Sequence, residues 1–261
     1  MQRKIRPAEN PPLQEQAGKH RQPPPQRRTR ALQAVAGTGA LSRGTGALSR
    51  GTGALLPIFQ YNAIPEPAQP KGTVMKLIIL DRDGVINQDR DDFVKSVDEW
   101  IPVEGSMDAV AFLTQAGYTV AVATNQSGIG RKYFTVQNLT EMHAKMHRLV
   151  RQAGGEINGI WFCPHTDADN CNCRKPKPGM IEDIIGRFNA QASETWLVGD
   201  SLRDLQAIDA VGGKPALVLT GKGKKTLSQH GHELPEHTQV FDTLLDFSQY
   251  IMQENAAPQA D

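Results

Sequence analysis

The sequence predicts an α/β domain built on a doubly wound parallel sheet. Three short apolar runs, at 77–80, 120–123 and 196–198, each end in polar residues suited to phosphate or metal ions. Such continuous runs are typical of strands that are buried on both faces. Apolar residues at helical spacing lie between the runs. A strand, helix, strand alternation of this length indicates a parallel sheet covered by helices on both faces.

Each element has its own local signal. Residues 93–103 alternate loosely and predict a small flap after the first strand. Gly117 and Gly154 are typical of helix ends, and Pro178 favours the start of a helix. The expected order after the flap is a helix at 107–117, a strand at 118–123, a helix at 139–153, a strand at 157–162, a helix from 178, a strand at 195–198, a helix at 202–211, a strand at 216–219, and a closing helix at 244–252 after Val240.

Residues 1–74 differ in composition from the rest of the chain. They contain 10 of the 17 prolines and 11 lysines and arginines against 3 acidic residues, whereas the remainder has 18 against 25. The heptapeptide at 37–43 is repeated at 44–50. Without apolar periodicity this extension is expected to be disordered. It is either a basic arm for nucleic acid or anionic lipid, a transit-type segment, or a sequence outside the native protein, whose start would be Met75. We favour the start at Met75.

The boundaries that follow are an extension at 1–74, a folded domain at 75–254 and a flexible tail at 255–261. No run approaches the roughly 20 apolar residues of a membrane span. All three cysteines fall between 163 and 173, an odd number that argues against a disulfide framework. We therefore expect a cytoplasmic, monomeric protein with a small-molecule substrate, and neither membrane nor nucleic-acid binding by its core.

Asp81 and Asp83 predict the central chemistry. Residues two apart on an extended segment point the same way, so both carboxylates can face the crevice at the strand end. One can attack phosphorus while the other donates a proton to the leaving oxygen and later takes one from water. An isolated Asp-x-Asp-Gly is more often a solvated turn. Its place directly after a buried strand favours the catalytic interpretation.

Other strand ends supply the groups that phosphate transfer needs. Thr124 and Asn125 offer a hydroxyl and an amide, and Lys175 lies in a cationic segment that can neutralise a phosphoryl group. Asp81, Asp200 and the backbone carbonyl of Asp83 would form an oxygen-rich site suited to Mg²⁺. Asp204 either orients Lys175 or a metal-bound water, or is a carboxylate favoured by the helix dipole.

A second metal site is predicted from spacing. Cys163, His165, Cys171 and Cys173 offer three thiolates and one imidazole, the ligand set of a closed, structural Zn²⁺ site. The alternative is one buried cysteine beside two incidental ones. Because this loop runs directly into Arg174 and Lys175, zinc would fix the position of these cations.

Together these motifs resemble the four motifs of the haloacid dehalogenase (HAD) superfamily of phosphatases, over residues 75 to about 252. The resemblance implies a HAD-like Rossmannoid core without a large cap domain. It implies that Asp81 forms an aspartyl-phosphate and that Asp83 is the acid and base. Thr124 and Lys175 would stabilise the phosphoryl group, and Asp200 would bind Mg²⁺.

The cysteine-bearing loop resembles that of two branches of this superfamily, the heptose bisphosphate phosphatases and the histidinol phosphatases. The segments at 124–131 and 175–180 are closer to the heptose branch. By this resemblance the substrate would contact Asp89, Arg90, Asp91, Asp92, Thr124, Asn125, Gln126, Ser127, Arg174, Lys175 and Ser201. Three hypotheses stay open: a sugar bisphosphate phosphatase, a phosphatase for histidinol phosphate or another small phosphate ester, and a zinc-stabilised binding protein that uses the basic arm.

Overall fold

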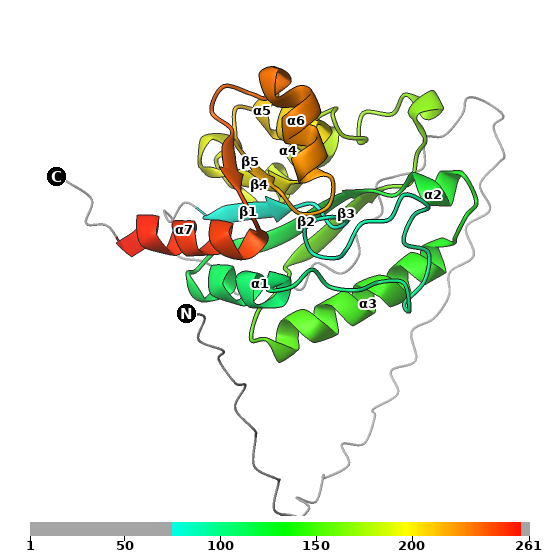
Figure 1. Cartoon of the computed structure of the whole chain (residues 1–261), viewed down its shortest axis with the longest axis horizontal. Helices are drawn as coiled ribbons and strands as arrows, with labels where there is room; N and C mark the ends of the chain where they lie inside the picture. Colours follow the sequence, from blue (N-terminus) through cyan, green and yellow to red (C-terminus); the bar gives the residue numbers. More distant parts are fainter. Residues whose placement is uncertain (1–74, 257–261) are drawn as a thin grey trace, which may run out of the picture. The chain divides into compact units, whose positions relative to one another are not determined.

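The computed structural model describes residues 75–256, which contain a six-stranded parallel sheet (Figure 1). The strand order is β3-β2-β1-β4-β5-β6, with every neighbouring pair parallel. The strands are β1 (Leu77–Leu80), β2 (Thr119–Asn125), β3 (Gly159–Cys163), β4 (Trp196–Gly199), β5 (Lys214–Val218) and β6 (Gln239–Phe241). The order runs outward from β1 in both directions, so β1, β2 and β4 meet at the topological switch point, where the ligands of such sheets bind.

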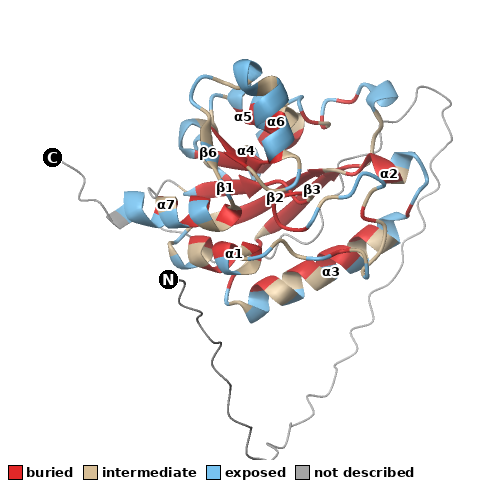
Figure 2. Ribbon diagram, in the orientation of Figure 1, coloured by how far each residue is buried: buried red, intermediate tan, exposed pale blue. Residues whose placement is uncertain are grey.

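Helices cover both faces of the sheet (Figures 1 and 2). The helices are α1 (Ser106–Gln115), α2 (Ser127–Gly130), α3 (Val136–Gln152), α4 (Gly179–Phe188), α5 (Leu202–Asp209), α6 (Gly223–His230) and α7 (Leu244–Ala256). In β1, Ile78 and Leu80 pack in a core with α1, α3 and α7, whereas Leu77 and Ile79 pack in a second core with α4 and α5. This alternation is the two-residue period of a strand, and both sets are fully buried.

The predicted doubly wound sheet is confirmed, with three local differences. Two helices, α2 and α6, were not expected. The flap at 93–103 forms no strand: Pro102 forms an isolated bridge with Asn87, and Val94 and Trp100 are buried in the core. The last helix continues to Ala256, two residues past the expected end of the domain at 254. Both α2 and α6 are short and rich in glycine or lysine, so neither presents a clear apolar stripe in the sequence.

The predictions for the extension at 1–74 and for residues 257–261 lie outside the described residues. Within 75–256, no helix combines the length and the apolar character that crossing a membrane would require.

Candidate active site and metal centre

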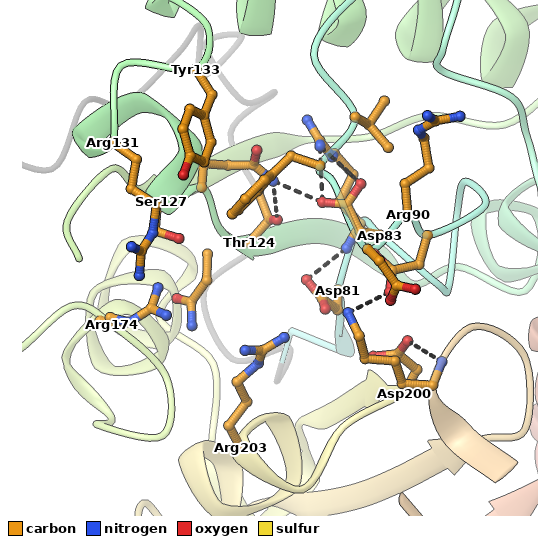
Figure 3. A pocket seen from close by; sticks show the side chains of 18 residues that line it. Asp81, Asp83, Arg90, Thr124, Ser127, Arg131, Tyr133, Arg174, Asp200 and Arg203 are labelled. Carbon is orange, nitrogen blue, oxygen red and sulfur yellow. Dashed lines mark hydrogen bonds and ion pairs between the residues drawn. The ribbon is translucent and has the colours of Figure 1, made fainter. Parts of the chain in front are cut away.

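The strand ends form a cavity of about 360 Å³ at the switch point. Asp81 follows β1, Thr124 lies at the end of β2, and Asp200 follows β4 (Figure 3). All three side chains are buried and line this cavity. Because β1 is hydrogen-bonded to both β2 and β4, residues more than 100 positions apart in the sequence converge there.

Lys175 is a fully buried cation next to the cavity. Its ammonium lies 3.0 Å from Oδ1 of Asp81 and 2.5 Å from Oδ1 of Asp204, and it donates a hydrogen bond of 2.7 Å to the carbonyl of Ala123. All three N–H groups therefore have acceptors. Burial alone would lower the pKa of Lys175, but the two carboxylates outweigh it and raise this pKa. The lysine stays charged beside Asp81.

The ionised form of Asp81 is energetically unfavourable in its buried position. Burial raises its pKa to about 6, with further contributions from Asp204 and Asp83, although Lys175 opposes this shift. The carboxylate accepts a hydrogen bond of 2.8 Å from the backbone N–H of Arg82. A buried carboxylate of this kind is a strong candidate for a functional group, because its ionised form needs a nearby positive charge.

Asp83 is held by neighbouring side chains. The Arg82 guanidinium lies 2.8 Å from its Oδ1, and the amides of Asn87 and Gln126 each donate a hydrogen bond of 2.9 Å. Burial alone would raise the pKa of Asp83, but these partners outweigh it and lower the pKa. Gln126 also donates to the Thr124 hydroxyl at 2.8 Å, so one amide connects the second aspartate with the expected phosphate-binding threonine.

Asp200 has too little positive charge around it. Its carboxylate accepts a hydrogen bond of 2.8 Å from the backbone N–H of Lys222, and within 75–256 it forms no ion pair. Burial, together with Asp204 and Asp81, raises the pKa of Asp200 well above its usual value. Gly84 and Gly221 have positive φ, and a Cβ at either would overlap this carboxylate. The backbone therefore leaves space only for the carboxylate itself.

These donors fit a hard divalent cation. The carboxylate oxygens of Asp81, Asp200 and Asp204 lie within 4.8 Å of one another. Those of Asp204 are already engaged by Lys175 and Ser201, which leaves Asp81 and Asp200 with free acceptor capacity. Mg²⁺ prefers such oxygen ligands and keeps several waters, so two carboxylates suffice. Its charge would oppose the effects of burial and of the neighbouring carboxylates, which raise the pKa of both groups.

The predicted cysteine cluster is assembled at the end of β3. The donor atoms of Cys163, His165, Cys171 and Cys173 lie within 4.8 Å of one another, and the five contacts between them span 3.4–3.6 Å. The three thiols are free and buried. A tetrahedral ion with Zn–S bonds of about 2.3 Å would place its sulfur ligands roughly 3.8 Å apart. The spacing is far longer than a disulfide and fits such an ion.

This loop, residues 163–173, holds the neighbouring cations. Arg174 donates to Asp167 at 2.7 Å and to the carbonyl of His165 at 3.4 Å. The side-chain amide of Asn125 bonds both the N–H and the carbonyl of Lys175, at 3.1 and 2.9 Å. The cysteine loop and the end of β2 therefore fix the segment that carries Arg174 and Lys175.

Most of the residues expected to contact substrate line the cavity. These are Asp89, Arg90, Asp91, Thr124, Asn125, Gln126, Ser127 and Arg174. Three do not: Asp92 is exposed and pairs with Arg90 and Lys95, Lys175 lies beneath Asp81, and the Ser201 hydroxyl bonds Asp204 as the N-cap of α5.

The cavity also contains residues that the sequence analysis did not identify. They are Arg82, Phe93, Val94, Arg131, Tyr133, Arg203 and Lys222. Arg131 and Arg203 each lie within one helical turn of a strand-end motif, at the end of α2 and the start of α5. Extending the strand-end argument by one turn would have found both. Lys222 has no such signal, since it follows β5 in a segment without a recognisable motif.

Comparison with known proteins agrees with this geometry. The model of the haloacid dehalogenase-like hydrolase family matches residues 76–212. D-glycero-beta-D-manno-heptose-1,7-bisphosphate 7-phosphatase of Pseudomonas aeruginosa is 52% identical over 177 residues, which are 68% of this chain and 98% of that protein. The corresponding protein of Bordetella bronchiseptica is 53% identical over 180 residues, 69% of this chain and 99% of its own length.

Two solved structures show the same similarity. The B. bronchiseptica D,D-heptose 1,7-bisphosphate phosphatase, complexed with magnesium and phosphate, gives a TM-score of 0.67 at 53% identity and covers 69% of this chain and 99% of its own. The D,D-heptose 1,7-bisphosphate phosphatase of Burkholderia thailandensis gives a TM-score of 0.55 at 47% identity and covers 68% of this chain and 98% of its own.

Proposed function

Because this chain belongs to the haloacid dehalogenase-like hydrolases, we propose that it removes the 7-phosphate of D-glycero-β-D-manno-heptose 1,7-bisphosphate, a step in the synthesis of lipopolysaccharide precursors. The observation that carries this proposal is the identity of 52–53% to two such phosphatases over almost their whole length. The polar cavity on the strand ends supports it, because it combines a buried carboxylate with several arginines.

Asp81 is the nucleophile in this proposal. One of its carboxylate oxygens attacks the phosphorus of the 7-phosphate, and the bond from phosphorus to the sugar oxygen breaks. The product of this step is an aspartyl-phosphate on Asp81. Lys175, 3.0 Å away, keeps the carboxylate ionised and partly neutralises the approaching phosphate.

Asp83 transfers the protons. It donates one to the departing sugar oxygen and later takes one from the water that hydrolyses the aspartyl-phosphate. Its pairing with Arg82 favours the ionised form, which suits the second role. The anionic substrate beside it would raise its pKa and favour the protonated form needed for the first. Thr124 and Ser127 line the cavity where their hydroxyls can bond phosphate oxygens.

Two metal ions belong to the proposal. Mg²⁺ held by Asp81, Asp200 and the carbonyl of Asp83 would screen the repulsion between nucleophile and phosphate. The magnesium in the B. bronchiseptica structure supports this assignment. Zn²⁺ held by Cys163, His165, Cys171 and Cys173 would be structural, since four protein ligands would leave no coordination position open for a substrate or water. The buried free thiols also support a reducing, cytosolic location.

Histidinol phosphate is the alternative substrate, because a phosphatase for it would need the same catalytic groups. The charge of the cavity disfavours it. Arg131, Arg174 and Arg203 all line the cavity, and a substrate with a second phosphate satisfies them better than one with an ammonium group.

A direct comparison of substrates tests this choice. We expect the highest kcat/KM on heptose 1,7-bisphosphate, with lower values on fructose 1,6-bisphosphate and histidinol phosphate. Phosphorus NMR of the product should show heptose 1-phosphate, in which the 1-phosphate is retained. A preference of tenfold or more for histidinol phosphate would overturn the assignment.

A further inference from the structure

The basic residues that line the cavity differ in whether their charge is already paired. Arg82 pairs with Asp83, Arg90 with Asp92, and Lys222 with Asp89. Arg131 and Arg174 both pair with Asp167. Arg203 differs from all of these. Its side chain forms no ion pair or hydrogen bond with any residue in 75–256, and its Nε is buried without a partner.

The position of Arg203 explains this isolation. It lies in the first turn of α5, between the N-cap Ser201 and Asp204, whose carboxylate is taken by Lys175 and by the cap. Its guanidinium points into the cavity, and in the view of Figure 3 it lies between Arg174 and Asp81. A buried guanidinium N–H without an acceptor is costly, and a bound anion would supply that acceptor.

We propose that Arg203 binds the phosphate group of the substrate that is not hydrolysed. This inference rests on the proposed function, because it requires a substrate with two phosphates. A guanidinium offers several N–H donors in one plane and matches two phosphate oxygens at once. Arg174 lines the same cavity and is oriented by Asp167, so the two arginines can hold the retained phosphate from two sides. Arg203 is then a residue that selects bisphosphates over monophosphates.

The test compares one substrate pair that differs only in the second phosphate. Wild type, Arg203→Gln, Arg203→Lys and Arg148→Gln are assayed on heptose 1,7-bisphosphate and on heptose 7-phosphate, with melting temperatures recorded for each. Arg148 is an exposed arginine on α3 that lies outside the cavity, so it is the matched control. Inhibition by heptose 1-phosphate, which carries only the retained phosphate, is measured in parallel.

For Arg203→Gln we expect KM on the bisphosphate and Ki for heptose 1-phosphate to rise about 10- to 100-fold, because the retained phosphate loses a charged hydrogen-bonding partner. On heptose 7-phosphate KM and kcat should stay near the wild-type values. Arg203→Lys should lie between wild type and Arg203→Gln, since it keeps the charge but not the planar donors. Arg148→Gln should behave as wild type.

Two results would overturn the inference. An unchanged KM on the bisphosphate would show that Arg203 does not contact the retained phosphate. An equal loss on both substrates would show that it acts on the transferred phosphoryl group or on the aspartates. If wild type prefers another bisphosphate, the proposed function fails, but the ratio for fructose 1,6-bisphosphate and fructose 6-phosphate still decides the role of Arg203.

Discussion

The Lys175 ammonium lies 3.0 Å from Oδ1 of Asp81, and both side chains are buried. The same ammonium contacts Asp204, so one cation faces two carboxylates. Even so, burial keeps the pKa of Asp81 at about 6. Burial and the neighbouring carboxylates therefore still disfavour the ionised form of Asp81, and a divalent cation bound to this carboxylate would favour it.

Replacement of Lys175 by methionine leaves two buried carboxylates without their cation. Removing one partner of a buried ion pair costs about 3–5 kcal/mol of unfolding free energy. Loss of a charge that stabilises the transition state lowers kcat by roughly 10²–10³. Urea denaturation and steady-state kinetics measure both. Lys224→Met, at an exposed lysine on α6, is the control. Near-native kcat in Lys175→Met would contradict the role of this lysine.

Substitutions of Asp204 and Ser201 distinguish a role in capping α5 from a role in positioning Lys175. Their side chains form the capping box of α5, but only Asp204 also contacts Lys175. Ser201→Ala should lower stability by about 0.5–2 kcal/mol, the usual cost of a lost cap, and leave kcat nearly unchanged. Asp204→Asn should lower kcat as well, because Lys175 loses an acceptor. Equal kinetic effects of the two changes would mean that Asp204 serves the helix alone.

Because the pKa of Asp81 is raised, we expect the binding of Mg²⁺ to depend on pH. The folded pKa of Asp81, about 6, exceeds the ordinary value of 3.8. In the metal-free protein, the stability contributed by the protonated group is fully present below pH 3.8 and is lost as pH rises through about 6. Mg²⁺ binds the ionised form, so it should raise the melting temperature more at pH 7 than at pH 5.

Thermal denaturation with and without Mg²⁺ at both pH values measures this difference. Asp81→Asn should reduce it, since asparagine does not titrate, whereas Asp200 still does. A shift by Mg²⁺ that is the same at pH 5 and pH 7 would separate metal binding from the ionisation of this carboxylate.

Removal of zinc should act on the neighbouring cations. We expect purified protein to contain about one Zn²⁺, and Cys171→Ser to lose it together with several degrees of melting temperature. KM should rise by about tenfold or more, because the loop that holds Arg174 loosens, whereas kcat should change little. Asn172→Ser, between two of the ligands, is the control. A zinc-free protein with unchanged kinetics and stability would reduce the cluster to a coincidence.

The sequence was sufficient for features that depend on local pattern. The buried runs before Asp81, Thr124 and Asp200 identify strands because a parallel sheet buries both faces of each strand. The ends of these strands then place the three residues at one edge. The spacing of the cysteines and His165 likewise required no knowledge of the fold.

Features that depend on tertiary contacts could not be read in this way. The partners of Lys175 come from three elements. The sequence left two roles open for Asp204, and the contact with Lys175 appears only in the fold. Lys222 reaches the cavity from the segment after β5, where the sequence carries no motif. The sequence does not show that the Arg203 side chain lacks a hydrogen-bonding partner, because this depends on which partners its neighbours have in the fold.

The most direct test of the account is the rate of phosphate release by Asp81→Asn on heptose 1,7-bisphosphate at saturating Mg²⁺. Asparagine has nearly the same size as aspartate, so the protein should fold, which a melting curve can verify. Because an amide does not attack phosphorus, we predict no turnover above the background of the assay. Release at a near-native rate by the folded variant would contradict covalent catalysis by Asp81.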